Sequence, residues 1–167
     1  LEIHYPDGNT DMVEYGWNTD SEIPNAKYYT LTHVSGRTYA TERYYDLLGR
    51  NICMRENGYY SDTCFDLKGN VYRISEPYIR GTSDADKLWH DFQYDQYGRI
   101  TNVIGPYTNE SYQYSGYTTT VTDNLRQTVS TQITDAAGRI RYASDQGGTV
   151  TYNYSHILYN DNVATQT

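Results

Sequence analysis

One short motif recurs through this chain of 167 residues and limits what the chain can fold into. The motif is an aromatic residue, Asp, two variable residues, Gly, and then Arg or Asn. It occurs at residues 45–50, 65–70 and 94–99, and once more at 134–139, where only the aromatic residue is missing. A motif repeated in this way indicates an array of similar units stacked side by side.

The spacing of the motif defines the unit. Its Asp residues are Asp46, Asp66, Asp95 and Asp135, and steps of about 20 residues relate most of them. The same steps reach Ser115 and Ser155, which follow the aromatic pairs of residues 112–114 and 152–154. Only the step from Asp66 to Asp95 is longer, which predicts an insertion within residues 77–90. We expect residues 1–167 to form a single unit, with the clearest repeats at 43–154 and a degenerate region at 16–40.

The chemistry of the motif predicts a tight hairpin turn. Asp at the first position of a type I turn accepts hydrogen bonds from backbone amides further on, and Gly three residues later tolerates a positive φ. The predicted turn residues are Asp46, Gly49, Arg50, Asp66, Gly69, Asp95, Gly98, Arg99, Asp135, Gly138 and Arg139.

A second turn signal lies halfway along each unit, at Asn57-Gly58, Gly105-Pro106, Asn124 and Gly147-Gly148. Between the turns, apolar and polar residues alternate with a period of two, as they do in Val150, Tyr152 and Tyr154. Each unit is therefore predicted to contain two strands and two turns. The fold class that follows is all-β, a meander of antiparallel β-hairpin repeats.

Tyrosine has to supply most of the packing in such a sheet. The chain holds 21 Tyr, whose rings can be buried while their hydroxyl groups stay hydrated or hydrogen-bonded. Tyr45, Phe65, Tyr94, Tyr114 and Tyr154 occupy equivalent positions in successive units, and we expect them to stack between neighbouring hairpins. The repeat aromatics as a set are Tyr45, Phe65, Tyr94, Tyr112, Tyr114, Tyr152 and Tyr154.

Charge and hydropathy exclude several classes of partner. A net charge of -8 and no run of Lys or Arg argue against nucleic acid or an anionic membrane. No apolar stretch approaches the length of a membrane span, so we expect a soluble chain. The two edges of an open sheet would expose unpaired strands, and self-association through these edges is a further expectation.

No arrangement of residues points to catalysis, to a cofactor or to a metal. The four His residues lack the spacing of zinc ligands, and most of the Asp residues are explained by turns. We therefore expect no enzyme and no catalytic, cofactor-binding or metal-binding residues. If a metal site existed, Asp86 and His90 would be its first candidates, since they lie four residues apart where Ser83 can cap a single helical turn.

The insertion has two interpretations. Binding residues are common on irregular loops, so it is the first candidate for a specific binding loop, through Arg80, Asp84, Asp86, Trp89 and His90. The interpretation that we favour is an insertion that is tolerated and has no role of its own.

The register of one hairpin decides whether Cys53 and Cys64 can form a disulfide. A type I′ turn at Asn57-Gly58 makes Cys53 and Cys64 diagonal neighbours and leaves their thiols free. A turn shifted by one residue, to Gly58-Tyr59, would place the cysteines opposite each other, within reach of a disulfide. Asn-Gly is the stronger hairpin signal, so we expect free thiols.

The motif resembles the YD repeat of Rhs proteins, which is shared by the shell subunits of bacterial insecticidal toxin complexes and by teneurins. Residues 4–10, HYPDGNT, also resemble a turn that is frequent in that family. The resemblance implies that these hairpins belong to a curved or spiral sheet, part of a larger shell of a secreted or cell-surface protein. In bacterial members that shell encapsulates a toxic C-terminal domain.

The partners implied by the resemblance are neighbouring repeats of a longer protein and an encapsulated C-terminal domain. The chain looks like an excerpt of such a shell, and the family's self-cleaving segment has no match in it. The alternative function is carbohydrate or cell-wall binding, because aromatic-rich hairpin repeats also build glycan-binding solenoids.

Overall fold

The computed structural model describes residues 1–154 and 164–166 of the chain. Every regular element in these residues is a β-strand. There is no helix in this part of the chain, and so none that is long and apolar enough to cross a membrane. The all-β prediction is confirmed.

The chain divides into two compact units, Leu1–His90 and Asp91–Thr167. The boundary follows the insertion, and the sequence repeat continues through both units. The strands of the first unit are β1 (Glu2–His4), β2 (Thr10–Trp17), β3 (Tyr28–His33), β4 (Thr41–Tyr45), β5 (Asn51–Glu56), β6 (Tyr59–Phe65), β7 (Val71–Ser75) and β8 (Tyr78–Ile79). Strand β9 (Trp89–Tyr94) leads into the second unit, which contains β10 (Ile100–Gly105), β11 (Thr108–Ser115), β12 (Thr118–Asp123), β13 (Thr128–Thr134), β14 (Ile140–Asp145), β15 (Gly148–Tyr154) and β16 (Ala164–Gln166).

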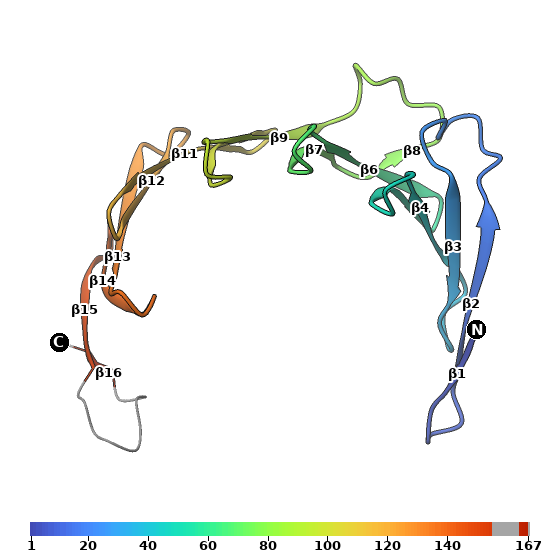
Figure 1. Ribbon diagram of the computed structural model, residues 1–167, viewed down its shortest axis with the longest axis horizontal. Coiled ribbons are helices and arrows are strands. Elements are labelled where there is room, and N and C mark those ends of the chain that lie inside the picture. The colour runs from blue at the N-terminus through green and yellow to red at the C-terminus, as the bar shows by residue number, and fades with distance from the viewer. Residues whose placement is uncertain (155–163, 167) are drawn as a thin grey trace. The chain divides into compact units, whose positions relative to one another are not determined.

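The strands follow one another as a meander (Figure 1). Successive strands are hydrogen-bonded neighbours, and the described pairs are antiparallel. The exception is β8, which lies off this path and pairs with β6. The strand order begins at β1 and ends at β16 without closing on itself. The predicted meander of antiparallel hairpins is therefore confirmed.

The four Asp-x-x-Gly turns share one backbone conformation. In the turn at Asp95, the Gly98 N–H donates to the Asp95 carbonyl at 3.1 Å, and the Asp95 N–H donates to the Arg99 carbonyl at 2.9 Å. The same two bonds close the turns at Asp46, Asp66 and Asp135. The φ angles are 75° at Gly49, 90° at Gly69, 79° at Gly98 and 78° at Gly138. These are type I turns followed by a left-handed glycine, as predicted.

The turn that begins at Tyr5 has the same backbone without the aspartate. The Gly8 N–H donates to the Tyr5 carbonyl at 3.0 Å, the Tyr5 N–H donates to the Asn9 carbonyl at 2.9 Å, and Gly8 has a φ of 85°. Tyr5 thus occupies the place that Asp holds in the other turns. The repeated turn extends to the start of the described chain.

A β-bulge follows each Asp-x-x-Gly turn, which the sequence analysis did not predict. Tyr94 pairs with Ile100, whereas Gln93 pairs with Asn102, so Thr101 is one extra residue in β10. The register shifts in the same way after the other three turns. The extra residues there are Ile52, Tyr72 and Arg141. A bulge increases the local twist of its strand, so each repeat twists the sheet at an equivalent position.

The turn between β5 and β6 has the register that Asn-Gly predicts. Asn57 and Gly58 have φ angles of 49° and 82°, as a type I′ turn requires, and Glu56 pairs with Tyr59. Cys53 consequently pairs with Asp62 and not with Cys64. Both cysteines are free, so that prediction is confirmed.

The buried side chains of the described residues all belong to the first unit. Cys53, Tyr44 and Tyr60 lie at its centre, with Ile23 and Ala26 from the loop between β2 and β3 packed against them. The described strands of the second unit contain no buried residue of this kind. Its sheet therefore depends on backbone ladders and on side-chain contacts at the surface.

Replacing Gly98 by Ala tests the turn. A Cβ atom meets nothing within 4 Å at this position, so the left-handed backbone is the reason for any loss. We expect Gly98→Ala to lower the free energy of unfolding in urea by about 1 kcal/mol or more. Gln96→Ala in the same exposed turn is the control and should be neutral. A Gly98→Ala variant as stable as the parent chain would contradict the assigned turn.

Candidate functional site

The aspartate of each repeat turn satisfies several donors with one carboxylate. Asp95 Oδ1 accepts the N–H groups of Tyr97 at 2.8 Å and Arg99 at 3.0 Å. Its Oδ2 accepts Nε of Arg99 at 2.7 Å and lies 2.7 Å from Nη2 of the same side chain. The turns at Asp46 and Asp135 repeat this arrangement with Arg50 and Arg139. The carboxylate therefore fixes both the loop and the direction of the arginine.

The turn at Asp66 carries Asn70 in place of arginine. Asp66 Oδ1 accepts two backbone N–H groups at 2.8 Å, and its Oδ2 accepts Nδ2 of Asn70 at 3.0 Å. The turn is complete without a guanidinium group. The arginine in the other three turns consequently has a further role.

That role is to cover an aromatic ring of the next hairpin. The guanidinium carbon of Arg99 lies 4.3 Å from the centroid of the Tyr114 ring. The corresponding distances are 4.6 Å from Arg50 to Phe65 and 4.6 Å from Arg139 to Tyr154. A guanidinium group over a ring is attracted by about 0.5–1 kcal/mol at an exposed site. These three pairs are called the arginine–ring pairs below.

The two tyrosines of these pairs are also held by their hydroxyl groups. The Tyr114 hydroxyl donates to the Ile100 carbonyl at 2.8 Å, and the Tyr154 hydroxyl donates to the Ile140 carbonyl at 2.7 Å. Each ring therefore leans over the strand that precedes its own. This contact links β11 to β10 and β15 to β14.

The stacking of repeat aromatics between neighbouring hairpins stays a prediction for the residues in these pairs. Phe65, Tyr114 and Tyr154 contact a guanidinium group. The described ring stacks lie in the first unit. There the ring centroids of Tyr45 and Tyr28 are 5.0 Å apart, and Tyr28 is not one of the repeat aromatics.

The other repeat aromatics have separate surroundings. The Tyr112 hydroxyl donates to Glu110 at 2.6 Å, and this bond and partial burial raise the pKa of Tyr112 to about 12. Tyr94 and Tyr152 lie on β9 and β15, both half-buried. Among the repeat aromatics, the described arginine partners are those of Phe65, Tyr114 and Tyr154.

Two irregular segments pack against the first unit. They are the β2–β3 loop, residues 18–27, and the insertion after β8, residues 80–88, and they lie side by side in Figure 1. Ile23 and Ala26 of the first segment join Tyr44, Cys53 and Tyr60 in the buried cluster. The region that matched the repeat poorly therefore supplies part of the core. The sequence analysis missed this role, because neither segment has a periodic pattern.

Ion pairs join the two segments to each other and to the sheet. Arg80 lies 3.0 Å from Asp20 and 3.1 Å from Glu22, so it bridges the insertion to the β2–β3 loop. Lys87 lies 2.8 Å from Asp62 of β6. The Tyr78 hydroxyl donates to the same carboxylate at 2.9 Å. The insertion is thus fastened to the first unit at several points.

The candidate binding-loop residues are not gathered into one site. Arg80 contacts the β2–β3 loop, whereas His90 Nε2 lies 2.6 Å from Glu76. The Nε1–H group of Trp89 donates to the backbone carbonyl of Asp84 at 3.2 Å. Asp86 accepts the Ser83 hydroxyl at 2.6 Å in a single turn, where no helix forms.

Asp86 and His90 therefore have different partners. Among the described residues, no group of three or more His, Cys, Asp or Glu side chains could hold a metal ion.

A groove of about 380 Å³ borders the insertion in the first unit. Its walls include Trp89, Tyr72 and the carboxylates of Asp46 and Asp62. These carboxylates are already engaged, Asp46 by its own turn and Asp62 by Lys87 and Tyr78. The polar groups of the groove thus serve the fold.

No protein-family model matches this chain, and no curated protein sequence matches it. The support for a function therefore comes from the geometry of the chain itself.

A double-mutant cycle tests the arginine–ring pair of Arg99 and Tyr114. We expect Arg99→Met and Tyr114→Leu to show a coupling of about 0.5–1 kcal/mol in the free energy of unfolding, because each variant removes the same contact. Arg126 makes a matched control, since it pairs with Asp123 at 2.6 Å at the far end of β12. The cycle of Arg126→Met with Tyr114→Leu should show no coupling. Equal couplings in the two cycles would refute the pair.

The turn aspartates should make the stability of the chain depend on pH. Hydrogen bonds from Asn70 hold the pKa of Asp66 below its usual value, and those from the Arg139 backbone and side chain do the same for the pKa of Asp135. A lowered pKa in the folded state stabilises the fold above the unfolded value of about 3.9. That stabilisation is lost as the pH falls through the lowered folded-state values.

Asp135→Asn is the variant that measures this effect. The free energy of unfolding of this variant should be lower than that of the parent chain. The difference should be largest above about pH 4 and should shrink below it, because Asp135 of the parent chain then loses its charge by protonation. Gln96→Ala removes no titrating group and should follow the parent profile. A deficit that stays constant down to pH 2 would show that the carboxylate charge plays no part.

Proposed function

We propose that this chain is a structural segment of a YD-repeat protein of the Rhs type. In the longer protein it contributes hairpins to a β-sheet shell, which encloses or presents a C-terminal toxin domain outside the cell. The observation that carries the proposal is the repetition of one complete device, the aspartate turn with its arginine over the next ring. The device occurs at Asp46, Asp95 and Asp135 with closely similar distances.

The use of the charged residues supports a structural role. The turn carboxylates are saturated by donors of their own hairpins, and Arg80 and Lys87 fasten the insertion. A catalytic centre needs one arrangement placed once, whereas the turn carboxylates occur as copies. We therefore propose a role without catalysis.

The open ends of the sheet support the proposed partners. Strands β1 and β16 stand at the two ends of the strand order, and each pairs with one neighbour. An unpaired strand edge is a template for another strand. In the proposal, neighbouring repeats of the longer protein cover both edges.

Glycan binding through the repeat aromatics is less well supported. Sugar rings stack on exposed aromatic faces, but a guanidinium group covers Phe65, Tyr114 and Tyr154. Binding of a glycan array by the chain, lost in a Tyr114→Leu variant, would favour that function instead.

Hydrogen exchange tests the structural role. The outward amides of β1 should exchange rapidly in this chain alone and at least tenfold more slowly in the full-length protein, because a neighbouring repeat would pair with them. The amides between β4 and β5 are the control and should exchange equally in both proteins. Unchanged exchange at β1 would count against continuation of the sheet.

Protease protection tests the enclosure of a C-terminal domain. In the full-length protein, that domain should resist protease while the shell is intact. It should be cleaved faster when Asp95 and Asp135 are both replaced by Ala, and Gln96→Ala should leave the protection unchanged. A domain cleaved equally in all three proteins would contradict enclosure.

A further inference from the structure

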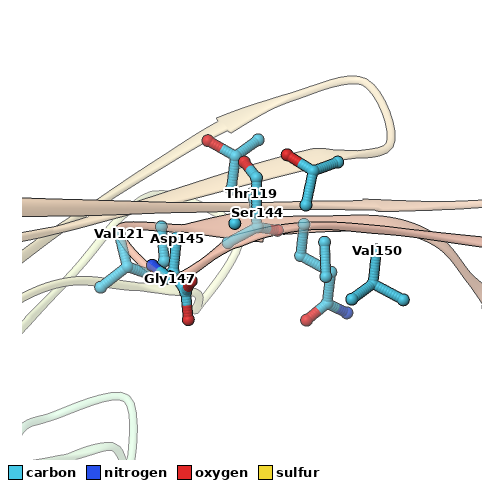
Figure 2. Close-up of a pocket in the computed structure, with 12 residues that line it drawn as sticks. Thr119, Val121, Ser144, Asp145, Gly147 and Val150 are labelled. Atoms are coloured by element: carbon cyan, nitrogen blue, oxygen red, sulfur yellow. Dashed lines mark hydrogen bonds between the residues drawn. The ribbon is translucent and has the colours of Figure 1, made fainter. Parts of the chain in front are cut away.

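Two hollows of the chain differ in the side chains that border them. In the hollow of about 460 Å³ over strands β12 to β15, the one charged residue is Asp145 (Figure 2). Its Oδ1 accepts the Gly147 N–H at 2.7 Å. A hollow of about 330 Å³ in the first unit is bordered instead by Lys87 and by Tyr60 and Tyr78. The second hollow therefore lies beside an amine.

Lys87 forms an ion pair that is largely shielded from solvent. Its Nζ lies 2.8 Å from Oδ2 of Asp62, and the two side chains are only 13% and 19% exposed. Oδ1 of a second carboxylate, that of Asp84, lies 3.6 Å from the same nitrogen, and this side chain is 73% exposed. One amine thus faces two carboxylates, of which one is shielded and the other reaches the solvent.

The strands explain why the ion pair is shielded. Tyr60 and Asp62 lie two residues apart on β6 and so share a face of the sheet. Tyr78 of β8 pairs with Tyr60 and lies on the same face. The insertion brings Lys87 to this face, where its Nζ lies 4.3 Å from the centroid of the Tyr78 ring and 5.6 Å from that of Trp89. Aromatic rings therefore cover the amine that the carboxylate holds.

The hydroxyl group of Tyr78 points at the shielded carboxylate. It lies 2.9 Å from both Oδ1 and Oδ2 of Asp62. Burial and the hydrogen bond to Asp62 raise the pKa of Tyr78, so the phenol keeps its proton and remains a donor. A donor in this place stabilises the negative charge that develops on a carboxyl oxygen when a nucleophile attacks Cγ.

The contact begins as an ion pair and can become neutral. Burial lowers the pKa of Lys87, but the bonds to Asp62 and Asp84 raise it overall, so the amine starts out charged. A proton that passes along the 2.8 Å contact from Nζ to Asp62 gives a neutral amine beside a protonated carboxyl group. The transfer leaves the net charge unchanged and removes two charges from a site with little water.

We propose that Lys87 and Asp62 become joined by an isopeptide bond, which fastens the insertion to β6 covalently. The neutral Nζ attacks Cγ of Asp62, and an N–C bond forms. The amine passes one of its two remaining protons to Asp84. The hydroxyl group of the Asp62 carboxyl then leaves with that proton as water, and Asp84 is a carboxylate again.

The product is an amide, and no oxidant, nucleotide or other reactant is consumed. The reaction occurs once within the chain itself, so it does not depend on the structural role proposed above. Groups held in a reactive geometry behave as if at effective concentrations of about 10⁵–10⁸ M. The released water has a way out, because the hollow of about 330 Å³ borders Lys87 and Tyr78.

Intact mass under denaturing conditions tests the bond. The purified chain, with its thiols reduced, should weigh about 18 Da less than its sequence requires, which is the mass of one water. A tryptic digest should contain the peptides of Asp62 and Lys87 joined to each other, with no cleavage after Lys87. A chain that is kept folded for several days and still has the full sequence mass would overturn the proposal.

Three variants assign the bond. Lys87→Arg keeps the positive charge but has no primary amine, so it should have the full mass of its sequence. Lys68→Arg is the matched control, since Lys68 lies in an exposed turn, and it should lose one water like the parent chain. Asp84→Asn lacks the proton acceptor and should form the bond at least about tenfold more slowly. The joined peptides of the parent chain are detected without any variant, so the test holds even if Lys87→Arg does not fold.

Two further results would contradict the proposal. A loss of water that persists in Lys87→Arg would place the dehydration elsewhere, for example in a succinimide at Asp7-Gly8. Complete cleavage by trypsin after Lys87 in the parent chain would exclude the bond directly. An Asp84→Asn variant that forms the bond at the parental rate would overturn the assigned proton acceptor. None of these results bears on the edge strands or on an enclosed domain, so the tests of the structural role stay separate.

Discussion

The carboxylate of the turn aspartate is the interaction on which the repeated sheet depends. One oxygen accepts two backbone amides that the turn would otherwise leave without a partner, and the other orients the arginine. The arginine then covers a ring of the next hairpin, and a tyrosine ring reaches back to the previous strand with its hydroxyl group. Each aspartate therefore connects three levels of structure, which are the loop, the hairpin and the contact between hairpins. In the second unit, whose described strands contain no buried residue, these contacts supply side-chain packing that a buried core supplies in other proteins.

The first unit is stabilised in a different way, by a cluster of buried side chains. Burying a large apolar side chain contributes about 1.5–3 kcal/mol, several times an exposed arginine–ring contact. The β2–β3 loop packs Ile23 and Ala26 against Tyr44, Cys53 and Tyr60 in the buried cluster. Arg80 and Lys87 hold these segments in place. The departures from the repeat are therefore where this protein gains a core, which argues against an insertion without any structural role.

Much of the fold could be predicted from the sequence because turn chemistry is local. Asp and Gly at fixed positions determined the hairpins, and Asn57-Gly58 determined the register that keeps Cys53 and Cys64 apart. The bulges could not be predicted, since the extra residues, Ile52, Tyr72, Thr101 and Arg141, share no chemical type. The core was missed for another reason. It joins segments far apart in the chain, and no periodic pattern connects Ile23 with Tyr60 or Asp20 with Arg80.

The partner of the arginine was also missed, although a signal for it lies in the sequence. Asn70 shows that the turn itself does not need arginine, because its amide bonds to Asp66 in the same way. Arginine follows the turns at Asp46, Asp95 and Asp135, and each of these turns precedes a hairpin with an aromatic residue opposite the arginine. After Asp66 the next repeat aromatic is Tyr94, which directly precedes Asp95. The arginine at the end of the motif therefore makes two contacts, one with the carboxylate of its own turn and one with a ring of the facing strand.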